Sequence, residues 1–220
     1  MKPTIRIIYF DYGNVLTLPS DTRLSTFLQK TAELHGFSYP RLREAYEKHR
    51  PLYDQDRLNA EQYWKAVFKD AGGELPLQEL PGIVHQDDSC WSEINPDVLL
   101  WVETLKEAGY QIGLLTNMPS RFYRMVIEPA TWKSLFQYQV VSGLLGMVKP
   151  DPAIFTHAIR ITGQPAETIV YMDDIQIHVD TAARLGIHAH LFEGLEVTAK
   201  NICALYNLPC PSISFNRTSL

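Results

Sequence analysis

The sequence predicts an α/β protein with a doubly wound parallel sheet and an all-helical segment inserted after the first strand. From residue 95 onward, apolar strand-like runs alternate with helical patterns, which is typical of parallel sheets with right-handed crossovers. Residues 18–94 show no such alternation, and they are too many for a plain connection. These two observations predict a sheet-forming core and a separate helical insert.

The predicted first strand ends on an acidic residue. Apolar and β-branched residues 5–10 precede Asp11, and Gly13 follows in a predicted tight turn. Open parallel sheets bind ligands beyond the carboxyl ends of their strands. Asp11 is therefore a candidate for chemistry, although an aspartate that caps a turn fits the same local pattern.

The insert contains three predicted helices. The first ends at Gly36, and the second is expected to stop at Pro51. The third begins at Asn59, with Gln62 placed to complete a capping box. Residues 74–94 are rich in proline, glycine and acidic residues, and no element is assigned to them.

The second half of the chain alternates between strands and helices. Strands are predicted at residues 110–115, 138–142, 169–172 and 188–192, and helices at 95–109, 153–162, 179–185 and 196–206. Polar residues follow two of these strands or open a helix, namely Thr116, Asn117, Lys149, Asp173 and Asp174. Because the carboxyl ends of parallel strands share one edge, we expect these side chains to gather near Asp11.

The predicted cluster suits a phosphate and a metal ion. Three carboxylates at one edge repel each other unless a cation lies among them, and hard oxygen ligands favour Mg²⁺. Lys149 offers a positive charge and Thr116 a hydroxyl group, and catalysis of phosphoryl transfer consists largely of such positioning and charge neutralisation. An aspartate such as Asp11 can also act as the nucleophile and form an aspartyl-phosphate.

The order of these motifs resembles the haloacid dehalogenase superfamily, subfamily IA. The motifs are Asp11, Thr116-Asn117, Lys149-Pro150-Asp151-Pro152 and Asp173-Asp174. The stretch Phe10-Asp11-Tyr12-Gly13-Asn14-Val15-Leu16 resembles the branch that holds a bacterial glucose-1-phosphate phosphatase and the phosphatase domain of soluble epoxide hydrolases. The resemblance implies a Rossmann-like core (residues 1–17 and 95–208), a helical cap (18–94) and a tail (209–220), which we expect to fray.

The resemblance also implies a metal site and a nucleophile. Asp11 is expected to be the nucleophile and a Mg²⁺ ligand, and Gly13 is expected to offer its backbone carbonyl to the metal. Asp174 is the expected direct acidic ligand, with Asp173 acting through water or from behind the ligands. Mg²⁺ is the expected cofactor.

The remaining motif residues are expected to bind the phosphoryl group. The resemblance places Thr116 and Asn117 against this group, and it assigns Lys149 to neutralise both the nucleophile and the phosphate. His178 stands where relatives often carry asparagine. We expect its side chain to pack in the core, and the alternative is that it orients a metal-bound water.

Gly13 departs from the pattern of the resembling phosphatases. Those enzymes usually carry a second aspartate at this position as general acid and base, and such catalysis contributes about 10²–10⁴-fold. Candidates in the insert for the missing group are His35, His49, Asp54 and Asp56. A substrate with a good leaving group is a second explanation, and weak or lost catalysis is a third.

The leading hypothesis is a hydrolase, a Mg²⁺-dependent phosphatase that acts on a small phosphorylated metabolite through an aspartyl-phosphate. A sugar phosphate is one candidate substrate. The alternatives are a metal-independent haloacid dehalogenase and a weakly active or non-catalytic protein that binds a phosphometabolite. The adjacent acidic residues 173 and 174 argue against a metal-free site.

The composition limits the classes of partner and the compartment that we expect for this protein. The formal net charge of −5 and the pI of about 5.8 disfavour a nucleic-acid partner. No apolar stretch is long enough to span a membrane, and no signal peptide is recognised. The 3 scattered cysteines fit a reducing compartment, so a cytoplasmic protein is expected. Both a monomer and a homodimer are compatible with the sequence.

Overall fold

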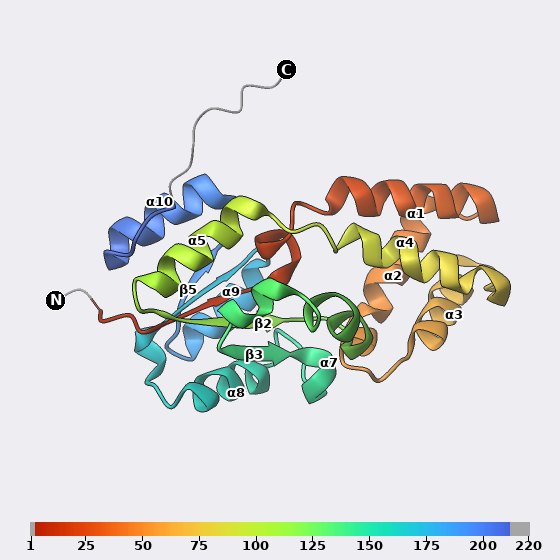
Figure 1. Cartoon of the computed structure of the whole chain (residues 1–220). Coiled ribbons are helices and arrows are strands. Elements are labelled where there is room, and N and C mark those ends of the chain that lie inside the picture. Colours follow the sequence, from red (N-terminus) through yellow and green to blue (C-terminus); the bar gives the residue numbers. More distant parts are fainter. Residues whose placement is uncertain (1–2, 212–220) are drawn as a thin grey trace, which may run out of the picture.

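A five-stranded parallel sheet forms the centre of the computed structural model, which describes residues 3–211 (Figure 1). The strand order is β3-β2-β1-β4-β5. The strands are β1 (Ile7–Phe10), β2 (Gln111–Thr116), β3 (Tyr138–Val141), β4 (Ile169–Asp173) and β5 (His188–Leu191). Each neighbouring pair runs parallel, and β1 lies in the middle between β2 and β4. The predicted fold class is confirmed.

Helices cover both faces of the sheet, because its central strands are apolar on both sides. Helices α5 (Pro96–Glu107) and α10 (Leu195–Tyr206) lie together on one face, as Figure 1 shows. Their buried residues share a cluster with Phe10. Helices α8 (Pro152–Thr162) and α9 (Gln176–Arg184) pack on the other face with Tyr9. Successive residues of β1 therefore contact opposite layers, as the two-residue period of a strand requires.

Shorter helical segments connect the larger elements of the core. They are residues Tyr12–Leu16, α6 (Ser120–Phe122), Tyr123–Ile127, Thr131–Leu135, α7 (Ser142–Leu145) and Ala166–Thr168. Several of them follow strand ends, so they line the edge of the sheet at which the polar motifs were expected.

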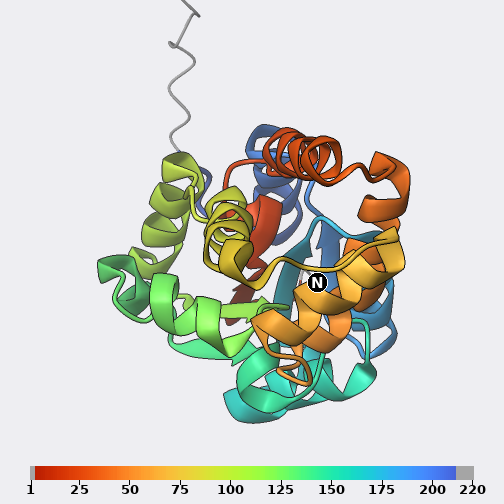
Figure 2. The same cartoon turned by 90° about the vertical axis from the view of Figure 1, so that its right-hand side faces the viewer.

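The insert between β1 and α5 consists of helices joined by short loops. It contains α1 (Asp21–His35), α2 (Tyr39–Asp54), α3 (Ala60–Ala71), the short turn Leu77–Glu79 and α4 (Leu80–Cys90). These helices share a core of their own that includes the fully buried Trp64 and Phe68. Figure 2 views the molecule from this end, with the insert helices in front of the sheet. The capping box between Asn59 and Gln62 is present.

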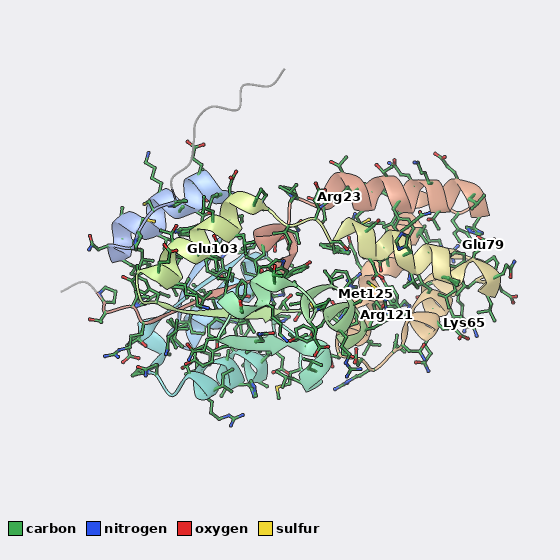
Figure 3. All side chains as sticks on the ribbon, in the orientation of Figure 1. Arg23, Lys65, Glu79, Glu103, Arg121 and Met125 are labelled. Carbon is green, nitrogen blue, oxygen red and sulfur yellow. The ribbon has the colours of Figure 1, made fainter. Side chains whose placement is uncertain are left out.

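The chain enters and leaves the insert through two adjacent segments. Thr17 and Ile94 form an antiparallel bridge, and the Leu18 N–H donates to the Glu93 carbonyl at 2.9 Å. A second contact joins the sheet-bearing part to the insert. The guanidinium of Arg121, which lies at this junction in Figure 3, pairs with Asp88 of α4. The insert is thus tied to the sheet edge both through its connections and through side chains.

The prediction that the second helix stops at Pro51 is wrong. Helix α2 continues through Pro51 to Asp54, and the Gln55 N–H donates to the Pro51 carbonyl at 3.2 Å. The last turn is held by tertiary packing, because Tyr53 stacks on Tyr63 of α3 with ring centroids 4.6 Å apart. Packing here outweighs the loss of one backbone N–H to proline.

Two other boundaries differ from the sequence predictions. Residues 80–90, to which no element was assigned, form α4, and α9 begins at Gln176 rather than at residue 179. The expected fraying of residues 209–220 does not hold at Pro209, whose carbonyl accepts a hydrogen bond from Trp101 Nε1 at 3.0 Å. Residues 212–220 lie outside the described residues. Among residues 3–211, no helix combines the length and apolar character needed to cross a membrane.

Candidate active site

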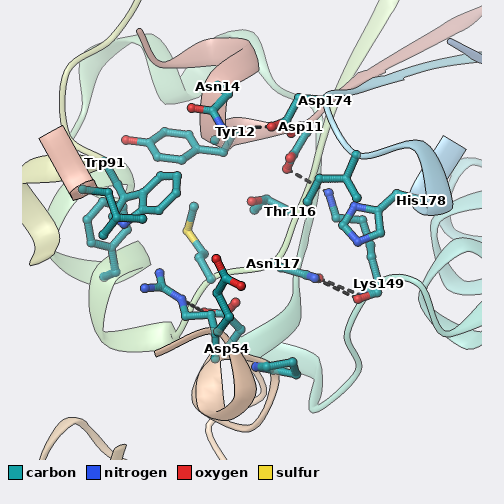
Figure 4. Close-up of a pocket in the computed structure, with 18 of the residues that line it drawn as sticks. Asp11, Tyr12, Asn14, Asp54, Trp91, Thr116, Asn117, Lys149, Asp174 and His178 are labelled. Atoms are coloured by element: carbon teal, nitrogen blue, oxygen red, sulfur yellow. Dashed lines mark hydrogen bonds and ion pairs between the residues drawn. The ribbon is translucent and has the colours of Figure 1, made fainter. Parts of the chain in front are cut away.

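The polar motifs meet at the carboxyl edge of the sheet. Asp11 directly follows β1, Thr116 ends β2, and Asp173 ends β4. Asp11, Thr116 and Lys149 line a cavity of about 460 Å³ between this edge and the insert (Figure 4). The structure therefore brings together the residues that the sequence places far apart, because the strands that precede them are neighbours in the sheet.

Lys149 is the central cation of the site. Its Nζ lies 2.9 Å from Asp11 Oδ1 and 2.6 Å from Asp173 Oδ2, and it also donates to the Leu115 carbonyl at 3.1 Å. The residue is only 3% exposed. Burial alone would lower the pKa of Lys149, but Asp11 and Asp173 reverse this effect and hold that pKa above its ordinary value. Lys149 is therefore kept protonated beside both carboxylates.

The two carboxylates that contact Lys149 respond differently. Burial raises the pKa of Asp11 to about 7, with Lys149 opposing the rise and Asp173 and Asp174 adding to it. Burial acts in the same direction on Asp173, but Lys149 and His178 more than offset it and hold the pKa of Asp173 well below its ordinary range. Asp173 is thus the firmly ionised partner of Lys149.

Three carboxylates form a potential metal site. One oxygen from each of Asp11, Asp173 and Asp174 lies within 4.8 Å of the others. Lys149 supplies a single positive charge against these three groups, so the site has a surplus of negative charge that suits a divalent cation. The donor set therefore fits Mg²⁺ better than it fits a site without metal.

Asp173 and Asp174 differ in how free their oxygens are. Asp173 is completely buried, and its Oδ1 accepts from the Ile175 N–H at 2.8 Å and lies 3.0 Å from His178 Nδ1. Asp174 is only half-buried and is oriented by Asn14, whose Nδ2 donates to its Oδ2 at 2.8 Å. These contacts favour Asp174 as the direct ligand and leave Asp173 in a supporting position.

Asn117 makes a contact that its sequence position does not predict. Its side-chain Nδ2 donates to the Lys149 carbonyl at 2.9 Å, and its Oδ1 accepts from the Lys149 N–H at 2.8 Å. The amide thus fixes the backbone of Lys149, while Thr116 is buried at the cavity wall. Asn117 reaches the cavity as expected, but its side-chain amide is already engaged. The binding of the phosphoryl group by these two residues stays a prediction.

Gly13 lies against the insert. A Cβ atom built on Gly13 would be 3.4 Å from Cζ3 of Trp91, an ordinary contact distance. Its φ of −64° does not require glycine. The position predicted for a second aspartate thus faces an indole ring instead, and the side chain of Gly13 can contribute no proton.

Sequence reasoning missed several groups around the site. Asn14 adopts a positive φ of 56° and holds both Asp174 and Ser20. Tyr171 places its hydroxyl 3.0 Å from Lys149 Nζ and donates to Asp173. The Asn at a tight turn was a usable signal, because asparagine tolerates left-handed backbone. Tyr171 gave none, since it reads simply as an apolar strand residue.

His178 is buried beside Asp173, so its packing role is combined with a polar contact. Of the four insert residues considered as proton donors, only Asp54 lines the cavity. His35 lies 3.2 Å from Glu79, His49 is 2.9 Å from Asp70, and Asp56 accepts from the Ser120 N–H; none of these three lines the cavity.

Comparison with known families identifies the class of protein. Residues 5–186 match the haloacid dehalogenase-like hydrolases. The chain belongs to this family. The family match, the parallel sheet and the site at its carboxyl edge agree with one another.

Curated relatives match parts of the chain. Phosphoglycolate phosphatase 1 of Pseudomonas aeruginosa is 25% identical over 103 residues, which cover 47% of this chain and 38% of that enzyme. Acyl-CoA dehydrogenase family member 10 of Mus musculus is 33% identical over 111 residues, which cover 49% of this chain and 10% of that protein. The chain thus spans less than two thirds of the length of either relative.

Solved structures share the fold over most of both chains. A predicted hydrolase of this family from Porphyromonas gingivalis is 23% identical with a TM-score of 0.63, covering 90% of this chain and 98% of that one. A family enzyme from Bacteroides thetaiotaomicron, in complex with magnesium and inorganic phosphate, is 19% identical with a TM-score of 0.62, covering 88% and 98%. An L-2-haloacid dehalogenase is 17% identical with a TM-score of 0.64, covering 88% of each chain.

Proposed function

We propose that the protein is a Mg²⁺-dependent phosphatase that hydrolyses a small phosphorylated metabolite through an aspartyl-phosphate on Asp11. The observation that carries this proposal is the buried Asp11 carboxylate held 2.9 Å from Lys149 Nζ within a cluster of three carboxylates. A nucleophilic carboxylate, a fixed cation and a divalent-metal site are the parts that phosphoryl transfer needs.

Each of these residues has a separate role in the proposed reaction. Asp11 attacks phosphorus, and Lys149 neutralises charge on both the carboxylate and the phosphoryl group. Thr116 binds a phosphoryl oxygen. Asn117 fixes the position of Lys149 through hydrogen bonds to its backbone. Because the site is buried, these charges act with little screening by water.

The metal would be held by the carboxylates of Asp11 and Asp174 and by the backbone carbonyl of Gly13. Asp173 is not a direct ligand in this proposal. Its carboxylate pairs with Lys149 and so fixes the position of the ammonium group. Mg²⁺, when bound, supplies positive charge that stabilises the transferring phosphoryl group. The surplus of negative charge among the three carboxylates supports this assignment.

The helical insert is proposed to act as a cap (residues 18–94) over a Rossmann-like core (1–17 and 95–208). A cavity of about 460 Å³ between them has room for a small metabolite such as a sugar phosphate, and it includes Arg50 and Trp91 of the insert. Membership of subfamily IA, in the branch of the glucose-1-phosphate phosphatases, remains part of the proposal. Phosphatases among the relatives and a magnesium–phosphate complex among the structural neighbours support the phosphatase function.

The dehalogenase alternative draws on structural neighbours that are L-2-haloacid dehalogenases. Such a reaction uses an aspartate nucleophile without metal, and it gains nothing from three clustered carboxylates. The acidic residues Asp173 and Asp174 therefore favour the phosphatase. We further propose that the protein acts in the cytoplasm, as a monomer or homodimer, without a nucleic-acid or membrane partner.

A substrate panel tests the proposal. Release of inorganic phosphate is measured from sugar phosphates, nucleotides, acyl phosphates and lipid phosphates, with MgCl₂ and with EDTA. Mg²⁺-stimulated release from at least one compound is expected. Chloride release from 2-chloropropionate is measured in EDTA, and its appearance without any phosphate release would establish the dehalogenase instead.

A further inference from the structure

Position 13 of the proposed phosphatase cannot protonate the leaving group, because Gly13 stands where a second aspartate is expected. Two carboxyl groups of α2 line the cavity, those of Glu47 and Asp54. Glu47 is largely exposed and pairs with Arg43, whereas Asp54 is buried at the end of the helix. We propose that Asp54 is a catalytic residue, the general acid and base of the reaction. This inference rests on the proposed phosphatase function.

The position of Asp54 is fixed by contacts with the sheet-bearing part. It is the last residue of α2, and its backbone carbonyl accepts a hydrogen bond from Ser142 Oγ at 2.6 Å. Two residues further on, Asp56 Oδ1 accepts from the Ser120 N–H at 2.9 Å. The end of α2 is therefore anchored to segments that follow β2 and β3. Figure 4 shows the Asp54 carboxylate pointing into the cavity from the side opposite Asp11.

One oxygen of Asp54 is available to a substrate. Oδ1 accepts from Arg50 Nε at 2.9 Å, whereas Oδ2 takes no hydrogen bond from any residue in the described range 3–211. The side chain is only 8% exposed. Asp54 lines the cavity, so a polar group of a bound substrate can reach its Oδ2 atom.

The surrounding charges allow Asp54 to carry a proton. Arg50 is shared between Asp54 and Asp87, whose Oδ1 lies 3.4 Å from Arg50 Nη1, so one positive charge faces two buried carboxyl groups. Burial raises the pKa of Asp54, Arg50 opposes this rise, Asp87 adds to it and Lys149 across the cavity lowers it, with a net increase. A carboxyl group of this kind can donate and accept a proton within one cycle.

The proton balance of the cycle is complete with Asp54. As Asp11 attacks phosphorus, the bond from phosphorus to the leaving oxygen breaks, and that oxygen takes its proton from the Asp54 carboxyl group. Water then attacks the aspartyl-phosphate and gives a proton to the Asp54 carboxylate as the bond from phosphorus to Asp11 breaks. Alcohol and inorganic phosphate leave, and both carboxyl groups return to their starting states.

The test compares two leaving groups in the Asp54→Asn variant. For an alkyl phosphate that the wild type hydrolyses, kcat/KM is expected to fall by about 10²–10⁴-fold, because an alkoxide leaves poorly without a proton. For 4-nitrophenyl phosphate, whose leaving group needs no proton, kcat/KM should change by less than about threefold. A burst of 4-nitrophenolate should also appear, because loss of the base slows the second step.

The Asp87→Asn variant is the matched control. Asp87 shares Arg50 but does not line the cavity, so Asp87→Asn keeps the Asp54 carboxyl group and should lower kcat/KM for the alkyl phosphate far less than Asp54→Asn does. An equal loss on both substrates in Asp54→Asn, or no loss on either, overturns the role of Asp54 and leaves the phosphatase intact. A wild type active only on activated phosphates also overturns it. A wild type that releases no phosphate from any compound rejects the proposed function itself, and Asp54 with it.

Discussion

The ammonium of Lys149 lies between two buried carboxylates, 2.9 Å from Asp11 Oδ1 and 2.6 Å from Asp173 Oδ2. Asp11 follows β1 and Asp173 ends the neighbouring strand β4, while Lys149 comes from a loop after β3. One cation thus joins three parts of the sheet edge. Its loss should affect both the folded state and the chemistry.

We expect the Lys149→Met variant to lose about 3–5 kcal/mol of unfolding free energy, because removing one partner leaves buried charge unpaired. Denaturant unfolding at neutral pH measures this loss. The Lys65→Met variant is the control, since Lys65 makes an exposed pair with Glu61 and should lose less than about 1 kcal/mol. Equal stability losses in the two variants would contradict the central place of Lys149.

Magnesium is expected to raise the melting temperature of the wild type, because a ligand that binds only the folded state stabilises it. The Asp174→Asn variant should lose this shift, since it removes a ligand while the position keeps a side chain of similar shape. Thermal unfolding with MgCl₂ and with EDTA measures the effect without any substrate.

The control for the metal experiment is Asp180→Asn, an exposed residue on α9 that does not line the cavity. It should keep the full Mg²⁺-dependent shift. A shift that survives in Asp174→Asn would place the metal elsewhere and remove the reason for the acidic cluster.

Gly143 admits no side chain at the junction between the sheet and the insert. A Cβ atom there would lie 2.3 Å from the Ser120 N atom and 2.9 Å from Asp56 Oδ1. We expect Gly143→Ala to cost about 1–3 kcal/mol of unfolding free energy through overpacking. It should also lower phosphate release, because it displaces the segment that holds Asp54.

The comparison variant for Gly143 is Gly82→Ala. Gly82 lies in α4, and a Cβ atom at this position would have no other atom within 4 Å. An added methyl group should therefore raise the unfolding free energy by about 0.5–1 kcal/mol. Similar stability in both alanine variants would show that the junction is looser than its contacts indicate.

Much of the core was predictable because its signals are local. Apolar runs bounded by turn residues mark the strands, and the rule for parallel sheets then places Asp11, Thr116 and Asp173 at one edge. The sequence could not show that Asn117 forms hydrogen bonds with the backbone of Lys149, because that contact joins two loops 32 residues apart. Such pairings depend on how the loops pack, which no local pattern encodes.

The insert was harder to predict than the sheet. Pro51 is an ordinary helix stop in a sequence, yet packing of Tyr53 on α3 carries α2 past it. That extra turn is what places Asp54 at the cavity. Asp54 and Asp56 looked equivalent in the sequence, and only the structure separates the one that lines the cavity from the one that binds Ser120.

The most direct test of the account is the rate of phosphate release by Asp11→Asn relative to the wild type, with saturating Mg²⁺ and the best compound of the panel. We predict a fall of about 10⁴-fold or more, because the variant removes the nucleophile. The exposed Asp97→Asn variant should match the wild type. Phosphate release by Asp11→Asn at a rate close to that of the wild type would contradict an aspartyl-phosphate on Asp11.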